Sequence, residues 1–188
     1  MTGKLIIFSA PSGAGKSTLV HYLLGCELGL EFSVSATSRA PRGTERNGVD
    51  YFFLSPEEFH HKIDNQEFVE YEEVYKDCYY GTLRSEIQRI TAKGSNVVFD
   101  VDVVGGLNIK NEFSDRALAI FVAPPSVEEL NKRLNNRGTD SAEMIRRRIE
   151  KAEYEMSFSS RFDVVVVNDD LEVAKAKTER LIRDFLNI

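Results

Sequence analysis

A glycine-rich loop near the N-terminus is the feature that most constrains this chain. An apolar run over residues 5–8 leads into the loop, in which Gly13 and Gly15 precede Lys16, and a helical pattern follows. The spacing matches the Walker A pattern G-x-x-x-x-G-K-[ST] except at its first glycine, where the chain has Ala10. Glycines allow backbone N–H groups to converge on an anion, and a helix N-terminus adds partial positive charge. The pattern therefore predicts a phosphate-binding loop, with an ordinary glycine turn as the alternative.

Side chains next to this loop have the chemistry that bound phosphates need. Lys16 would lie beside the terminal phosphates, and the Ser17 hydroxyl would complete a Mg²⁺ shell. Farther along, a predicted strand that starts at Asn96 has an apolar run over residues 97–99 and ends in Asp100 and Asp102, which alternate and so share one face. A carboxylate at a strand end beside such a loop holds Mg²⁺ directly or through water. Ser17 and Asp100 are the candidate ligands, and which aspartate binds the ion directly stays open.

Composition and charge narrow the function classes. The 188 residues are 42% hydrophobic and 29% charged, enough for one globular unit with small inserted lobes. The formal net charge of −6 argues against a general nucleic-acid or anionic-membrane binder, although a polyanionic small substrate needs only a local cationic site. Cys26 and Cys78 have no metal-ligand spacing and form no disulfide framework, and no cleavable apolar segment precedes the first strand. We therefore expect a cytoplasmic protein.

Strand and helix patterns alternate along the chain. Continuous apolar runs lie near residues 5, 97, 118 and 164. They predict an α/β fold with a parallel sheet that helices cover on both sides. The segment from about 35 to 82 is richer in strands and aromatic residues, which predicts a separate lobe beside the site. There we expect a strand over 48–54, a strand-like acidic stretch over 67–80, and a helix from about Leu83 to Lys93 that Gly81 and Thr82 introduce.

Arginines gather in two regions. Arg39 and Arg42 lie in one loop with a proline between them, where two guanidinium groups suit a phosphate clamp, while a solvated basic turn fits equally well. Arg133 and Arg137 are four residues apart on a predicted helix and share a face. The consecutive arginines at 146–148 fan out around the next helix, so at most two can face one ligand.

Together these segments resemble the guanylate kinases, P-loop enzymes that phosphorylate GMP from ATP. The resemblance covers essentially the whole chain. Its motifs are, in order, Ser9-Ala-Pro-Ser-Gly-Ala-Gly-Lys-Ser-Thr, Ser33-Val-Ser-Ala-Thr-Ser-Arg-Ala-Pro-Arg-Gly, Tyr79-Tyr-Gly-Thr, Phe99-Asp-Val-Asp, Arg133-Leu-Asn-Asn-Arg-Gly-Thr and Val167-Asn-Asp-Asp. It implies a three-layer α/β/α P-loop NTPase fold with a core (1–34, 85–125 and 157–188), an inserted GMP-binding lobe (35–84) and a helical lid (126–156).

The resemblance also implies the site residues. The catalytic set would be Lys16, Arg39, Arg133, Arg137 and Arg148. The ATP contacts would be Ser12, Gly13, Ala14, Gly15, Lys16, Ser17, Thr18, Arg137, Asn168 and Asp169. GMP would contact Arg39, Arg42, Tyr51 and Tyr80 through its phosphate, and Ser35, Glu70, Thr82, Asp102 and the nearby Asp100 elsewhere. Mg²⁺ would accompany ATP, dGMP would serve as a second acceptor, and neither nucleic acid nor a membrane would be a partner; the oligomeric state stays open.

The chemistry of guanine agrees with the assignment of Glu70. Guanine presents adjacent N1–H and N2–H₂ donors that one carboxylate can accept together, whereas adenine presents an acceptor at N1. A polar group left unpaired by the wrong base could discriminate by roughly 10⁴. No general base is needed, because the attacking phosphate oxygen is already anionic near neutral pH.

Three alternatives compete with this interpretation. Asp102-Val-Val-Gly105 fits the D-x-x-G pattern of a GTPase switch, but the chain has no N-K-x-D motif for base recognition. A guanylate-kinase-like scaffold domain without catalysis is the second, although such domains usually lose the loop lysine that is present here as Lys16. The third is another nucleotide kinase of related fold.

Overall fold

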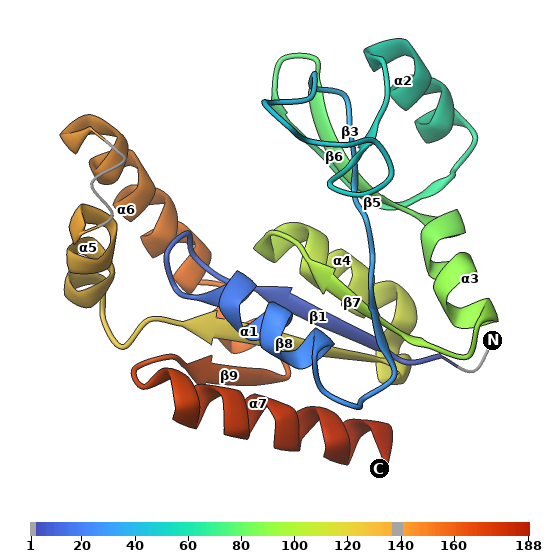
Figure 1. Cartoon of the computed structure of the whole chain (residues 1–188). Coiled ribbons are helices and arrows are strands. Elements are labelled where there is room, and N and C mark those ends of the chain that lie inside the picture. The colour runs from blue at the N-terminus through green and yellow to red at the C-terminus, as the bar shows by residue number, and fades with distance from the viewer. Residues whose placement is uncertain (1–2, 137–140) are drawn as a thin grey trace.

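Five parallel strands form the central sheet of the computed structural model, which describes residues 3–136 and 141–188 (Figure 1). The strands lie in the order β2-β7-β1-β8-β9. Their bounds are Leu5–Ser9 (β1), Leu30–Phe32 (β2), Asn96–Asp100 (β7), Ala117–Ala123 (β8) and Val164–Val167 (β9). Because all neighbours are parallel, their carboxyl ends meet at one edge of the sheet. The predicted parallel α/β fold is confirmed.

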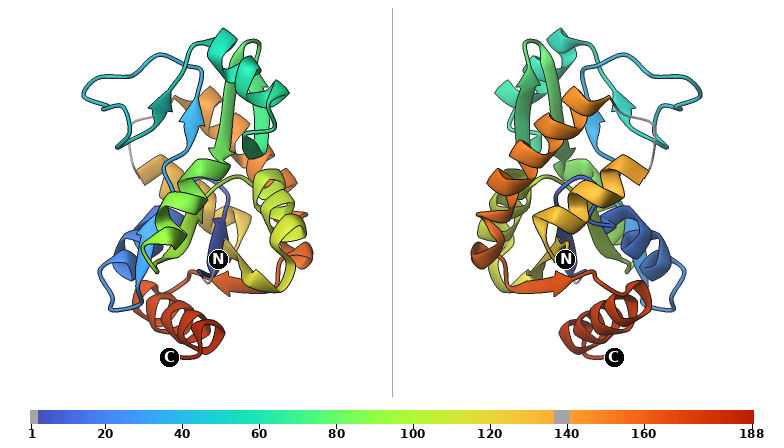
Figure 2. Two further views of the ribbon diagram at one scale, coloured as in Figure 1. Left: turned by 90° about the vertical axis from the view of Figure 1, so that its right-hand side faces the viewer. Right: turned by 90° about the vertical axis from the view of Figure 1, so that its left-hand side faces the viewer.

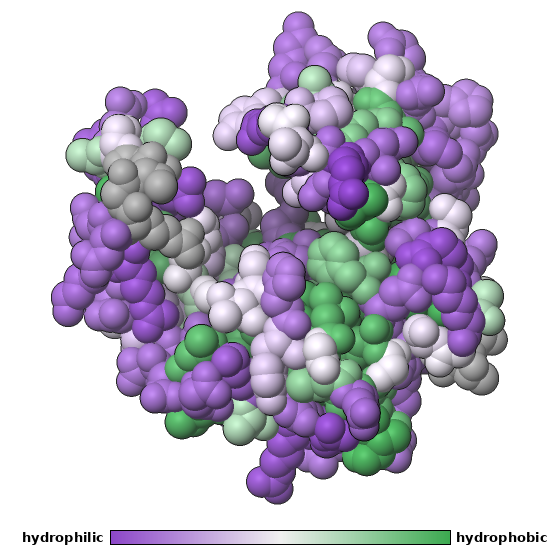
Figure 3. All heavy atoms as spheres, in the orientation of Figure 1, coloured by the Kyte–Doolittle hydropathy of each residue, from purple (hydrophilic) through white to green (hydrophobic). Residues whose placement is uncertain are grey.

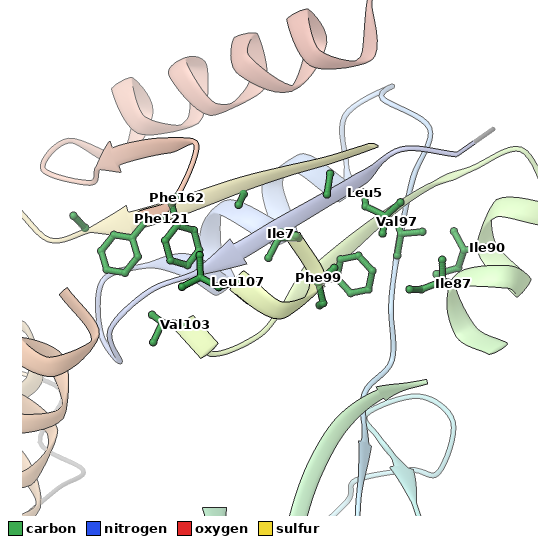
Figure 4. Close-up of a cluster of buried hydrophobic side chains, with 14 residues drawn as sticks. Leu5, Ile7, Ile87, Ile90, Val97, Phe99, Val103, Leu107, Phe121 and Phe162 are labelled. Atoms are coloured by element: carbon green, nitrogen blue, oxygen red, sulfur yellow. The ribbon is translucent and has the colours of Figure 1, made fainter. Parts of the chain in front are cut away.

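Helices cover both faces of this sheet. On one face α1 (Lys16–Leu24) and α7 (Leu171–Leu186) pack over Ile6 and Phe8. On the other, α3 (Arg84–Ala92) and α4 (Val103–Phe113) pack over Leu5 and Ile7, as Figure 4 shows. Successive side chains of β1 therefore enter opposite cores, and all are fully buried. This burial on both faces explains why the strands read as continuous apolar runs rather than as alternating patterns.

A second sheet stands beside the first and has the strand order β4-β3-β6-β5. Its strands are Ala36–Thr37 (β3), Phe52–Phe53 (β4), Phe68–Tyr75 (β5) and Cys78–Leu83 (β6). Helix α2 (Pro56–Asp64) packs on it through Phe59, whose ring centroid lies 4.3 Å from that of Phe68. Ser55 and Glu58 form a capping box at the start of α2.

Of three local predictions in this region, one is wrong in extent and two are confirmed. The expected strand over 48–54 is reduced to β4, and the stretch over 67–80 is two antiparallel strands joined by a hairpin. The helix expected to follow Gly81 and Thr82 is confirmed as α3, which begins at Arg84. Gly81 and Thr82 themselves lie inside β6, because this strand pairs with β3 and β5 up to the start of the helix.

Two further helices, α5 (Val127–Asn136) and α6 (Ala142–Met156), form an arm that follows β8. They pack on each other through Leu130, Leu134, Ile145 and Ala152. The arm and the second sheet rise from the same side of the central sheet, as Figures 1 and 2 show. Short 3₁₀ turns over Ser114–Arg116 and Ser159–Arg161 complete the elements. None of the helices within the described ranges combines the length and apolar character that crossing a bilayer requires.

Candidate active site

The phosphate-loop candidate follows β1 at the carboxyl edge of the central sheet and lines a cavity. Figure 3 shows a hollow on this side of the molecule, between the arm and the second sheet. The loop contributes one wall, and residues after β7 together with the buried Glu155 of α6 contribute the other. The polar or loop residues that line it are Ser12, Gly13, Gly15, Lys16, Ser17, Thr18, Asp100, Val101, Asp102 and Glu155. The structure thus brings most of the predicted loop residues together with both aspartates.

Lys16, Ser17 and Asp100 contact one another in this cavity. The Lys16 ammonium forms an ion pair with the Asp100 carboxylate and lies 3.3 Å from the carbonyl oxygen of Val101. Ser17 Oγ donates to Asp100 Oδ2 at 3.4 Å. A hydroxyl and a carboxylate are oxygen ligands that suit Mg²⁺. In the described part of the chain, no three His, Cys, Asp or Glu side chains are grouped to hold a metal ion, so a cation here would take its remaining ligands from phosphates and water.

Asn168 fixes the loop from the end of β9. Its side-chain Nδ2 donates to the main-chain carbonyl of Ala14 at 2.8 Å, and its main-chain carbonyl accepts from Arg133 Nη1 at 3.0 Å. A Cβ on Gly15 would lie 2.2 Å from Asn168 Nδ2, and Gly15 has a φ of +94°, so this position requires glycine. Behind the loop, a second cavity is lined by Gly13, Gly15, Thr18, Arg133, Asn136, Asn168, Asp169 and Leu171.

The arm reaches the loop through one of the predicted arginines. Arg148 Nη1 of α6 donates to Ser12 Oγ at 2.9 Å. Arg133 of α5 lies at the second cavity, as described above. Arg137 lies outside the described residues. Two of the three predicted arm arginines therefore lie close to the phosphate-loop candidate.

A third cavity lies between the second sheet and the end of β7. It shares Asp100, Val101 and Asp102 with the loop cavity, so the two cavities meet at these residues. Its other lining residues are Ser35, Tyr51, Glu70, Glu72, Val74, Tyr80, Gly81 and Lys151. Most of the predicted acceptor residues are therefore gathered on one side of the aspartates, and the loop lies on the other.

Glu70 is the most buried acid of this third cavity, with 8% of its surface exposed. Thr82 Oγ1 donates to its Oε1 at 2.6 Å. Burial raises the pKa of Glu70 to about 7, although the Thr82 bond favours the carboxylate. The cavity thus holds a carboxyl group that binds a proton more readily than an exposed glutamate.

This pKa makes the stability of the fold depend on pH in a definite direction. The unfolded chain releases the Glu70 proton near pH 4.5 and the folded chain near pH 7. Between these values the folded state binds more protons, so the free energy of unfolding falls as pH rises. Glutamine does not titrate, so the free energy of unfolding of Glu70→Gln should not fall in this way. Between about pH 5 and pH 8 it should rise relative to that of wild type by up to about 3 kcal/mol. Denaturant titrations at both pH values measure the gain; a difference that is the same at both would contradict it.

A cluster around Arg39 forms the outer wall near this cavity. Arg39 Nε donates to the Tyr80 hydroxyl at 3.0 Å, and the guanidinium lies 4.9 Å from the centroid of the Tyr51 ring. Its Nη1 and Nη2 donate to the two carboxylate oxygens of Glu45 at 2.7 and 2.8 Å. The backbone N–H of Arg42 also donates to Glu45, at 2.8 Å. These bonds lower the pKa of Glu45 to about 2, so the acid stays charged and holds Arg39 in place.

The structure explains the D-x-x-G sequence as a helix cap. Asp102 is the N-cap of α4, and its Oδ1 accepts from the N–H groups of Val104 and Gly105 at 2.7 and 2.8 Å. Strand β7 ends at Asp100, so the prediction that both aspartates share a strand face is wrong: the chain turns into the helix between them. Both nevertheless line the same two cavities.

Sequence reasoning missed four charged residues near the site: Glu45, Glu72, Lys151 and Glu155. Glu72 is two residues after Glu70 on β5, and this spacing could have identified it, because alternate strand residues share a face. Partial desolvation at the cavity, followed by a hydrogen bond with Asp102, raises the pKa of Glu72 to about 7, although the residue is exposed on its other side. Burial also raises the pKa of Glu155. No local signal marks Lys151 or Glu155, because only the packing of α6 brings them to the cavities.

Comparisons with known proteins assign nearly the whole chain to one family. The guanylate kinase family profile matches residues 2–185. A guanylate kinase of Bacteroides thetaiotaomicron is 65% identical over 187 residues, which are 100% of this chain and 92% of that protein. One of Bacteroides fragilis is 60% identical, over 98% of this chain and 91% of its own length. A crystal structure of guanylate kinase from Anaplasma phagocytophilum superposes with a TM-score of 0.75 at 29% identity, covering 97% of this chain and 85% of that one. The chain belongs to the guanylate kinase family.

Proposed function

We propose that this protein transfers the γ-phosphoryl group of ATP to GMP, and to dGMP, giving ADP and GDP or dGDP in purine nucleotide metabolism. Family membership along nearly the whole chain supports the reaction. The observation that carries it is the meeting of two cavities at Asp100–Asp102. One contains a glycine loop with a lysine, and the other contains a buried carboxyl group. A donor and an acceptor nucleotide bound there would have their phosphates adjacent.

On the donor side, the loop amides and Lys16 would bind the ATP phosphates, and Asn168 and Asp169 would lie near the adenine. Arg133 lies at the cavity behind the loop and Arg148 contacts Ser12, which supports their role at the donor phosphates. Arg137 is assigned the same role from the sequence. Ser17 and Asp100 would hold Mg²⁺, which neutralises charge on the donor phosphates when bound.

On the acceptor side, Arg39, Arg42, Tyr51 and Tyr80 would bind the GMP phosphate. The contacts among Arg39, Tyr51 and Tyr80 support one phosphate site. The base would lie deeper, with its N1–H and N2–H₂ donating to Glu70. Four more residues would complete the pocket. Three of them line the cavity, namely Ser35, Asp100 and Asp102, and Thr82 takes part through its hydrogen bond to Glu70.

The chain would work as three parts. The central sheet and its helices (1–34, 85–125 and 157–188) form the core, residues 35–84 bind GMP, and residues 126–156 form a lid. Transfer would need no general base, because the acceptor oxygen is already anionic. Lys16 and the arginines would offset charge while the phosphoryl group moves in line between two oxygens. Closure of the lid over both nucleotides would exclude water and so suppress ATP hydrolysis.

We assign the protein to the cytoplasm, with small-molecule substrates. Cys26 and Cys78 are both free thiols, as a reducing compartment would keep them.

A coupled assay of ADP release tests the proposed reaction. The acceptors are GMP, dGMP, AMP, CMP and UMP, each with ATP and Mg²⁺. Rapid release with GMP and dGMP alone is the expected result. Release that is equal for AMP and GMP would contradict the guanine pocket, and rapid release without any acceptor would indicate an ATPase.

Glu45→Gln should weaken GMP binding through Arg39. An amide has only one acceptor oxygen, so one of the two Arg39 bonds would be replaced by two opposed donors. Because a slightly misplaced binding group costs up to about 100-fold, we expect the KM for GMP to rise about tenfold or more, with the KM for ATP unchanged. Steady-state kinetics measure both. Glu172→Gln, which breaks a surface pair with Lys175 on α7, is the control; an unchanged KM for GMP in Glu45→Gln would refute the role of Glu45.

A further inference from the structure

The Glu70 carboxyl group lies directly against the first turn of α4. A Cβ atom on Gly105 would lie 2.7 Å from Glu70 Oε2 and 3.1 Å from Glu70 Cδ. Real Cβ atoms do not approach other atoms so closely, so the carboxyl group occupies the space that any side chain at position 105 would need. The other carboxyl oxygen, Oε1, is held by Thr82 Oγ1 at 2.6 Å. The Glu70 carboxyl group therefore lies between a strand hydroxyl and a helix backbone.

Backbone conformation does not explain a glycine at this position. Gly105 is a helical residue inside α4 and is not among the residues with positive φ. Glycine weakens a helix relative to alanine, so the position carries a cost without a conformational need. The neighbouring Gly106 has a different reason, because its Cβ would meet Ser9 Oγ and Ile7 in the core. At Gly105 the nearest obstacle is the end of the Glu70 side chain.

The helix turn cannot easily move away from Glu70. Asp102 Oδ1 accepts from the N–H groups of Val104 and Gly105, which fixes the first turn of α4 to the end of β7. Glu70, in contrast, is the end of a flexible side chain on a strand of the other sheet. A side chain at position 105 would therefore displace the carboxyl group toward the cavity rather than displace the helix.

We propose that Gly105 is a specificity-determining residue: its lack of a side chain sets how deep the Glu70 carboxylate lies and so completes the guanine pocket. This inference rests on the proposed function, in which Glu70 accepts from guanine. The D-x-x-G sequence then has two separate parts in this chain. Asp102 caps α4, and Gly105 makes room for the acid that recognises the base.

Gly105→Ala tests the proposal, with Val104→Ala as the matched control. Val104 lies one position earlier on the same helix, has 38% of its surface exposed and already carries a Cβ. For Gly105→Ala we expect the KM for GMP to rise about 10- to 100-fold, which is the effect of losing one charge-assisted hydrogen bond. The KM for ATP should stay within about twofold, and the preference for GMP over AMP should fall. The melting temperature should change little, because the helix preference of alanine offsets the displacement of the Glu70 carboxyl group. Val104→Ala should leave all four values unchanged.

The Glu70→Ala background shows whether the effect passes through Glu70. There the carboxyl group is absent, so adding Gly105→Ala should leave the KM for GMP unchanged and should not lower the melting temperature. An unchanged KM for GMP in Gly105→Ala, or an equal rise in both backgrounds, would overturn the proposal. If Gly105→Ala alone does not fold, the double variant must fold for the proposal to stand. A Glu70→Ala variant with a normal KM for GMP would instead refute the proposed role of Glu70 itself.

Discussion

Lys16→Ala is expected to lower kcat by about 10²- to 10³-fold, because it removes a fixed cation from the place where phosphoryl charge develops. The Lys16 ammonium lies in the loop cavity, paired with Asp100 and 3.3 Å from the carbonyl of Val101. Because Lys16 lines a cavity, its removal should leave the fold intact. Steady-state kinetics with saturating ATP and GMP measure the loss, and circular dichroism with a melting curve checks the fold.

Lys93→Ala is the matched control for this result. Lys93 is a surface lysine with 54% of its side chain exposed, and it pairs with Glu31 away from the cavities. It should keep full turnover. Turnover near the wild-type value in Lys16→Ala would rule out the phosphate-loop mechanism. If Lys16→Ala does not fold, Lys16→Arg is measured in its place. This variant should fold and still turn over slowly, because the charge of arginine is spread over a planar group.

Glu70→Ala is the second large effect, and it should fall almost entirely on GMP. Two hydrogen bonds from guanine to one carboxylate would be lost, which predicts a rise in the KM for GMP of about 10²- to 10⁴-fold. The KM for ATP should change by less than about threefold, because Glu70 lies in the cavity of the second sheet and not in the loop cavity. Initial rates with each nucleotide varied in turn measure the two constants.

Glu73→Ala provides the comparison on the same strand. Glu73 lies on β5 three residues after Glu70, is exposed, and accepts from the N–H of Asp77. Its removal should leave both KM values unchanged. A Glu70→Ala variant in which the KM for GMP and the KM for ATP rise equally would show that Glu70 is not in the base pocket.

The central sheet could be predicted from the sequence because its signal is local. Runs such as residues 5–8 and 97–99 are buried on both faces, and only a sheet covered twice requires such continuous apolar strands. The glycine loop between β1 and α1 could also be predicted, since its glycines, lysine and serine lie within residues 13–17. The position of Asp100 could be predicted because the carboxyl ends of neighbouring parallel strands meet at one edge of the sheet, and Asp100 is the last residue of the strand next to β1.

The second sheet and the finer geometry of the site could not be predicted in the same way. Gly81 and Thr82 directly precede a helix, yet they lie in β6, where β5 pairs with both residues and β3 pairs with Gly81. Glu45 looks like one of many surface acids until the loop folds back on Arg39. Gly105 has no sequence signal for its contact with Glu70, 35 positions earlier, because that contact depends on how the two sheets are placed. Contacts of this kind depend on tertiary structure alone.

The most direct test of the central claim follows the phosphoryl group itself. ATP labelled at the γ-phosphate is mixed with GMP, Mg²⁺ and excess protein, and the products of a single turnover are separated. The account predicts that the label appears in the β-phosphate of GDP. Little label should reach inorganic phosphate, either in this reaction or in a parallel one without GMP. Label that appears in inorganic phosphate at a rate independent of GMP, with none in GDP, would contradict it.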